Sequence, residues 1–128
     1  MECKTVTARE IKQITETFVE KEKYITWHGK RIKVNPLLSV VEVFELLNNI
    51  KNGCTKQPDN LIVIEAIDFV FKAKTIEAYT SIVLPEQIDD QYKTIYSTDL
   101  VNVVFESVNQ AQLQSIKKMV SAYSGMDL

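Results

Sequence analysis

The segment from Tyr24 to Val34 limits the fold of this 128-residue chain more than any other segment. A two-residue turn at His28-Gly29 would join two short strands in antiparallel register. In that register the side chains divide into an apolar face and a polar face. The apolar face has Ile25, Trp27, Ile32 and Val34, and the polar face has Tyr24, Thr26, Arg31 and Lys33. Because a lone hairpin is only marginally stable in water, the apolar face must pack on other elements, with Trp27 as a core anchor.

A helix is predicted before the hairpin, from Ala8 to about Glu20. Thr7-Ala8-Arg9-Glu10 has the form of a capping box, in which a threonine oxygen and a glutamate satisfy the first free amides of a helix. One apolar stripe follows at helical spacing, made of Ile11, Ile14 and Phe18. The threonines and Val19 leave a strand open as the alternative.

A second capping box, Ser39-Val40-Val41-Glu42, begins a helix that is expected to end at Gly53. Its apolar residues keep helical spacing and are Val40, Val43, Phe44, Leu47 and Ile50. Glycine adopts a left-handed conformation at no steric cost, so Gly53 is predicted to be the helix stop.

A polar loop, Gly53–Asp59, leads to a long element from Asn60 to about Tyr79 that is apolar on nearly all sides. Such a helix is normally central and buried, and Asp59 could cap it. The β-branched run Ile62-Val63-Ile64 leaves open whether residues 60–65 begin as strand or helix.

Three further helices are predicted after an extended link from Tyr79 to Leu84. The first of these helices is predicted to have Pro85 in its first turn. The positive end of its dipole would lie near the acidic residues Glu86, Asp89 and Asp90. Ile88, Tyr92 and Ile95 form its apolar stripe. Another begins after Asp99, with Leu100, Val103, Val104 and Val108. The last is capped by Asn109 and carries Leu113, Ile116, Val120 and Tyr123 to a point near Gly125.

The resulting prediction is one α+β domain over residues 1–128, in which one antiparallel β-hairpin packs against a bundle of about five helices. A chain of this length can bury about two thirds of its unfolded surface, so it needs no disulfide or metal staple. We expect residues 1–6 and 125–128 to be flexible. No apolar run is long enough to span a bilayer, and nothing resembles an export leader, so we expect a protein of a reducing cytoplasm.

The residue inventory argues against an enzyme, a metal site or a cofactor. The chain has one histidine, His28, two cysteines, Cys3 and Cys54, and three isolated glycines. Zinc needs three or four close His or Cys ligands, and phosphate-binding loops need clustered glycines. Both cysteines are predicted to be free thiols, and His28 is predicted to be a turn residue. Asp68 and Lys72 stand four residues apart and are predicted to pair on a helix face.

The polar face of the hairpin is the candidate partner-binding site, through Tyr24, Thr26, Arg31 and Lys33. Aromatic and arginine side chains are enriched at interface centres, and the outer edges of a two-stranded ribbon can accept another strand. The alternative is a merely solvated face, in which lysine prevents unwanted strand pairing. The net charge of −2 makes nucleic acid an unlikely partner.

Several short segments occur in a familiar order along the chain. They are Lys23-Tyr24-Ile25-Thr26-Trp27-His28-Gly29-Lys30-Arg31-Ile32-Lys33-Val34, Leu37-Leu38-Ser39, Tyr79-Thr80-Ser81-Ile82-Val83-Leu84-Pro85, Ile95-Tyr96-Ser97-Thr98-Asp99 and Val108-Asn109-Gln110-Ala111-Gln112. In this order the chain resembles small uncharacterised proteins of tailed bacteriophages of gut and Gram-positive bacteria, over residues 22–119. The resemblance implies a virion component or assembly factor of the tail or neck, located in the host cytoplasm, in the virion or in both. It carries over no functional residue.

The sequence therefore predicts a non-enzymatic phage structural protein or assembly chaperone. Such a protein would bind other phage or host proteins, and could also form a homo-oligomer. The first alternative is a phage-encoded inhibitor of a host defence protein. The second is a nucleic-acid-binding module, which rests on the hairpin alone.

Overall fold

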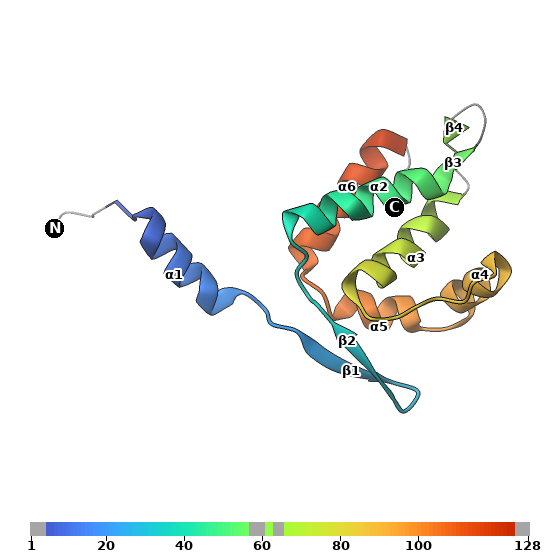
Figure 1. Cartoon of the computed structure of the whole chain (residues 1–128), viewed down its shortest axis with the longest axis horizontal. Helices are drawn as coiled ribbons and strands as arrows, with labels where there is room; N and C mark the ends of the chain where they lie inside the picture. Colours follow the sequence, from blue (N-terminus) through green and yellow to red (C-terminus); the bar gives the residue numbers. More distant parts are fainter. Residues whose placement is uncertain (1–4, 57–60, 63–65, 125–128) are drawn as a thin grey trace.

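The computed structural model describes residues 5–56, 61–62 and 66–124, and these contain six helices and two short antiparallel strand pairs. The helices are α1 (Ala8–Phe18), α2 (Val40–Cys54), α3 (Ile67–Tyr79), α4 (Ile88–Ser97), α5 (Leu100–Glu106) and α6 (Gln110–Ser124). The strands are β1 (Lys23–Trp27), β2 (Lys30–Val34), β3 (Thr55–Lys56) and β4 (Leu61–Ile62). Helices α2–α6 form the body, the β1–β2 hairpin lies against it, and α1 extends away (Figure 1). The α+β class is confirmed, with one helix more than the five predicted.

The hairpin has the predicted register, from Lys23 opposite Val34 to Trp27 opposite Lys30. Both turn residues are left-handed, with φ of 50° at His28 and 74° at Gly29, as a two-residue hairpin turn requires. On the apolar face Ile32 and Val34 are buried, and Ile25 and Trp27 are half-buried against the core. The alternation along the sequence was therefore sufficient to orient the ribbon.

Three polar contacts attach the hairpin to the body. The backbone N–H of Asn35 donates to the Tyr79 carbonyl at 2.8 Å, and that of Ser81 donates to the Lys33 carbonyl at 3.1 Å. The indole Nε1 of Trp27 donates to Oδ1 of Asp99 at 2.8 Å. Trp27 thus packs on the core as predicted, while its polar edge is satisfied at the start of α5.

Helix α3 is the central element, as its apolar sequence predicted, and it contacts α2, α4 and α5. Its buried residues are Ile67, Val70, Phe71, Ala73, Thr75, Ile76 and Tyr79. It begins at Ile67, not at Asn60, because Leu61–Ile62 pairs as β4 with β3. The helical start was wrong and the strand alternative was right at these two residues. The proposed Asp59 cap lies outside the described residues, as do residues 1–4, 63–65 and 125–128.

Helix α4 is less buried than its sequence suggested. It begins at Ile88 after the cap residue Gln87. Pro85 therefore lies before the helix and not in its first turn, where the sequence had placed it. Of its predicted stripe only Ile95 is buried, while Ile88 and Tyr92 are exposed. The helix contacts α3 and α5 and lies at one edge of the body (Figure 1). The predicted cap of α6 is confirmed, since Asn109 Oδ1 accepts from the Gln112 backbone at 2.8 Å.

Gly53 does not stop α2, which corrects the sequence prediction. It lies inside the helix, which continues to Cys54, and it has no left-handed backbone. A Cβ at this position would lie 2.7 Å from Cγ1 of Val70 on α3. Glycine is needed here because two helices approach closely.

We predict that Gly53→Ala destabilises the protein by about 1 kcal/mol, because overpacking against Val70 outweighs the gain in helix propensity. Urea unfolding measures the difference. In a Val70→Ala background the same substitution should be neutral or stabilising. A stabilising Gly53→Ala in the native background would contradict the close approach.

One side-chain amide joins three parts of the body. Oε1 of Gln112, on α6, accepts from the Leu38 backbone N–H at 2.9 Å and from the Tyr79 hydroxyl at 2.7 Å. Its Nε2 donates to the Leu38 carbonyl at 3.0 Å. Nearby, the Asn109 N–H donates to the Pro36 carbonyl at 2.8 Å. The hairpin-to-α2 connection is thereby fixed to the end of α3 and the start of α6.

Gln112→Ala should lower the free energy of unfolding by about 2–4 kcal/mol, since it leaves the Tyr79 hydroxyl and both Leu38 backbone groups without this partner. The matched control is Gln114→Ala, at an exposed position on the same helix. It should change stability by less than about 0.5 kcal/mol. Equal effects in chemical denaturation would refute the role of the amide.

Candidate protein-binding surfaces

The structure brings the four predicted hairpin residues together on one exposed face. Tyr24 lies opposite Lys33, and Thr26 lies opposite Arg31. The guanidinium carbon of Arg31 is 4.0 Å from the centre of the Tyr24 ring, a cation–π arrangement. Lys33 Nζ is 3.2 Å from Oε2 of Glu22. The face is therefore accessible, and its role in partner binding stays a prediction.

The second exposed surface is the N-terminal arm, which we define as α1 with the link 19–22. The predicted Thr7 capping box is confirmed, and the strand alternative is wrong. The helix ends at Phe18 and not at Glu20. None of its residues is buried, and Figure 1 shows it directed away from the body. The arm stripe, Ile11, Ile14 and Phe18, is 55%, 54% and 79% exposed.

Exposure of the arm stripe has an energetic consequence. Isolated helices of this length are marginal in water, and most helices in proteins gain their stability from packing an apolar face. Full burial of each stripe residue would contribute about 1.5–3 kcal/mol. Among the described residues nothing supplies that packing, so the arm is suited to contact another surface. The helical spacing revealed the stripe, but it gave no sign that the body leaves it uncovered.

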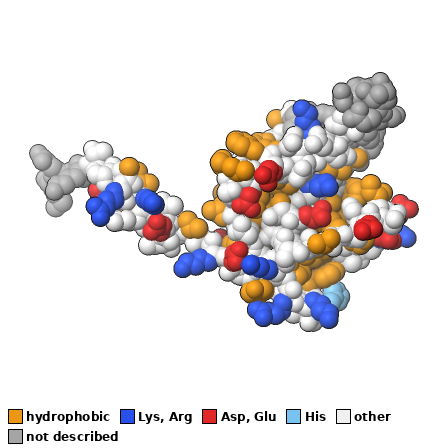
Figure 2. All heavy atoms as spheres, viewed as in Figure 1, with side chains coloured by type: hydrophobic (Ala, Val, Ile, Leu, Met, Phe, Trp, Pro, Cys, Tyr) orange, Lys and Arg blue, Asp and Glu red, His pale blue; other side chains and the backbone are white. Residues whose placement is uncertain are grey.

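An apolar groove between α2 and α6 is the third surface, and the sequence did not predict it. Its volume is about 580 Å³. The wall from α2 includes Val40 and Phe44, which are 66% and 64% exposed, and the wall from α6 includes Ala111 and Met119. Hydrophobic side chains are visible on the arm and on the edge of the body nearest to it (Figure 2). We call this feature the α2–α6 groove.

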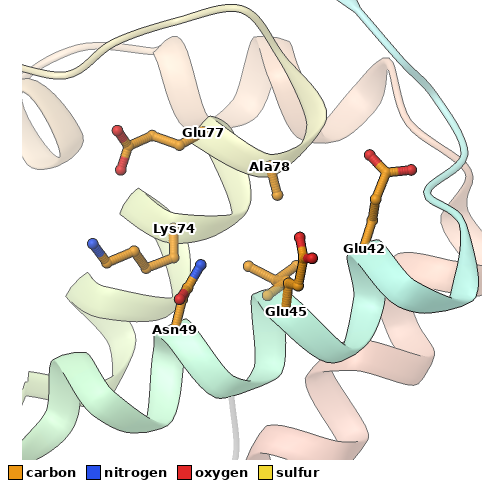
Figure 3. A pocket seen from close by; sticks show the side chains of 7 residues that line it. Glu42, Glu45, Asn49, Lys74, Glu77 and Ala78 are labelled. Carbon is orange, nitrogen blue, oxygen red and sulfur yellow. The ribbon is translucent and has the colours of Figure 1, made fainter.

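On the other side of α2 the surface is polar. A hollow of about 320 Å³ lies between α2 and α3, where Glu42, Glu45 and Asn49 face Lys74 and Glu77 (Figure 3). Within the described ranges, no three His, Cys, Asp or Glu side chains are grouped closely enough to hold a metal ion. The hollow therefore presents mixed charge without a chelating arrangement.

Asp68 and Lys72 pair on α3 as predicted, with Nζ 2.8 Å from Oδ2. The Tyr96 hydroxyl also donates to this oxygen at 2.5 Å, and the Tyr96 ring lies beside Tyr92 and Phe69. Partial burial would raise the pKa of Asp68, but the hydrogen bonds from Lys72 and Tyr96 outweigh it and hold the pKa below its ordinary value of 3.8. The cluster joins α3 to α4.

Because the folded pKa of Asp68 is depressed, its ionisation stabilises the fold above pH 3.8, and this contribution is lost as the pH falls through the folded value. Lys72→Gln should raise the Asp68 pKa, as followed by carboxyl NMR. Lys74→Gln, on the same helix outside this cluster, is the control and should leave it unchanged. No rise in Lys72→Gln would show that the pairing does not set the pKa.

The reactive side chains lie apart. Cys54 is a buried free thiol whose pKa is raised by burial, so it is a poor nucleophile. His28 is at the hairpin tip, with its ring edge-on to Trp27. The turn role predicted for His28 is confirmed, as is the free state of Cys54; Cys3 lies outside the described residues.

Comparison of the chain with protein-family models, curated proteins and solved structures found no match. Across residues 5–56, 61–62 and 66–124, no helix is both long and apolar enough to cross a membrane.

Proposed function

We propose that this chain is a non-enzymatic bacteriophage assembly protein, a tail or neck component or a chaperone, that binds another protein through its N-terminal arm. One observation carries the protein-binding part: α1 is a capped amphipathic helix whose entire apolar stripe is exposed. Amphipathic helices of this kind bind by placing their apolar face in a groove of the partner. The phage context comes from the resemblance of residues 22–119 to tailed-phage proteins.

The same exposed helix could bind a host defence protein, so a phage-encoded inhibitor of such a protein is the alternative function. The nucleic-acid alternative has less support. Lys33 lies 3.2 Å from Glu22, and Lys23 lies 3.7 Å from Glu20. Two of the cations that would follow a phosphate backbone thus already face carboxylates, which weakens the electrostatic attraction.

The test is the double variant Ile14→Glu/Phe18→Glu, which places two charges on the arm stripe. Since neither residue is buried, the free energy of unfolding should stay within about 0.5 kcal/mol of the native value. Partner capture and incorporation into phage particles should be lost. The control is Lys12→Gln/Gln13→Glu, which changes the charge by the same amount away from the stripe and should retain both.

A hairpin variant separates the two exposed surfaces. Tyr24→Ala/Arg31→Glu removes the cation–π pair on the polar face while leaving the arm stripe intact. If this variant loses binding and the arm variant retains it, the hairpin is the binding surface and the arm proposal is wrong. If partner capture and particle formation survive both variants, assembly through either surface is refuted.

A further inference from the structure

We infer that the arm of one copy docks in the α2–α6 groove of a second copy. This rests on the proposed function in one respect, because both require the arm stripe to bind protein. It goes further by naming the partner as this same chain and the receptor as the groove beside Val40 and Phe44. Within the part of the chain that the structure describes, an exposed amphipathic helix and an apolar groove occur on the same molecule.

The dimensions of the two features agree. From Ile11 to Phe18 the stripe extends over seven residue steps, or about 10 Å along a helix. The groove wall from Ala111 to Met119 extends over eight steps of α6, or about 12 Å. A helix laid along α6 would therefore bring the whole arm stripe over the groove.

The chain path favours a second copy over the arm's own body. Glu22, at the end of the link, lines a hollow with Glu42 and Ala78, on the α3 side of α2. The α2–α6 groove is on the opposite side of α2. The ion pairs of Glu22 with Lys33 and of Glu20 with Lys23 hold the root of the arm. These exposed ion pairs are weak, so the direction of the chain is the stronger argument. To reach its own groove, the arm would have to turn back past the start of α2, whereas it is directed away from the body (Figure 1).

Interface area also favours reciprocal exchange. A stable interface buries about 800 Å² on each partner, whereas one aromatic residue buries about 150–250 Å². One arm stripe with three apolar residues supplies only part of the required area. In a two-fold dimer each copy gives an arm and receives one, so both contacts form together and the buried area doubles.

The experiment measures the mass of the full-length chain by sedimentation as its concentration rises. The native protein should dimerise. Ile14→Glu/Phe18→Glu on the arm and Val40→Glu/Phe44→Glu in the groove should each weaken dimerisation by more than about 100-fold. All four positions are exposed in the single copy, so circular dichroism should show an intact fold. The matched controls are Lys12→Gln/Gln13→Glu on the arm and Asn48→Glu/Asn52→Glu on α2, which should dimerise normally.

Mixing the two interface variants gives the sharper result. The arm variant keeps an intact groove, and the groove variant keeps an intact arm. Each alone should be monomeric. Together they should form a one-to-one complex that is weaker than the native dimer, because it keeps one of the two arm–groove contacts. The inference would be overturned by a mixture that associates no more than either variant alone at high micromolar concentration, or by a native protein that is monomeric there. If the native protein is monomeric but the arm variant still abolishes partner capture, self-docking is refuted and the proposed function is supported.

Discussion

The Gln112 amide is the contact on which the arrangement of the body most depends. This one side chain forms hydrogen bonds with the backbone N–H and carbonyl of Leu38 and with the hydroxyl of Tyr79. These partners come from the hairpin-to-α2 connection and from the end of α3, which are far apart in sequence. Because buried polar groups are normally paired, the Gln112 amide stabilises the approach of these segments, together with the backbone hydrogen bonds of Asn35 and Asn109. The same contact sets where α2 and α6 meet, and so where the groove opens.

The arm is energetically separate from this network. Its helix has no buried residue, and its root is held to the hairpin by exposed ion pairs, which contribute little each. The body keeps its core whether or not the arm is bound. Binding and stability can therefore be altered independently here, which is uncommon for a helix in a small domain.

Local signals in the sequence predicted much of the fold. The hairpin register followed from the turn at His28-Gly29 and strict alternation, and the caps at Thr7, Ser39 and Asn109 marked helix starts. The errors arose where tertiary contacts decide the outcome. Glycine often ends a helix, but Gly53 lies inside α2, where it allows the close approach of Val70 on α3.

The exposed surfaces were predictable only in part. Alternation identified the exposed hairpin face, and helical spacing identified the arm stripe. Whether an apolar stripe is covered depends on where the rest of the chain lies, and spacing does not contain that information. The groove joins Phe44 to Met119, which are brought together only by the packing of α2 on α6.

The Thr7 capping box has a consequence for the speed of recognition. It satisfies the first amides of α1 from within the chain, so it raises the fraction of molecules in which the arm is helical before any partner arrives. A segment that is already helical loses less conformational entropy on docking than one that must fold on contact. Association would then be governed by collision and orientation, and the lifetime of the complex by how well the stripe fits its receptor.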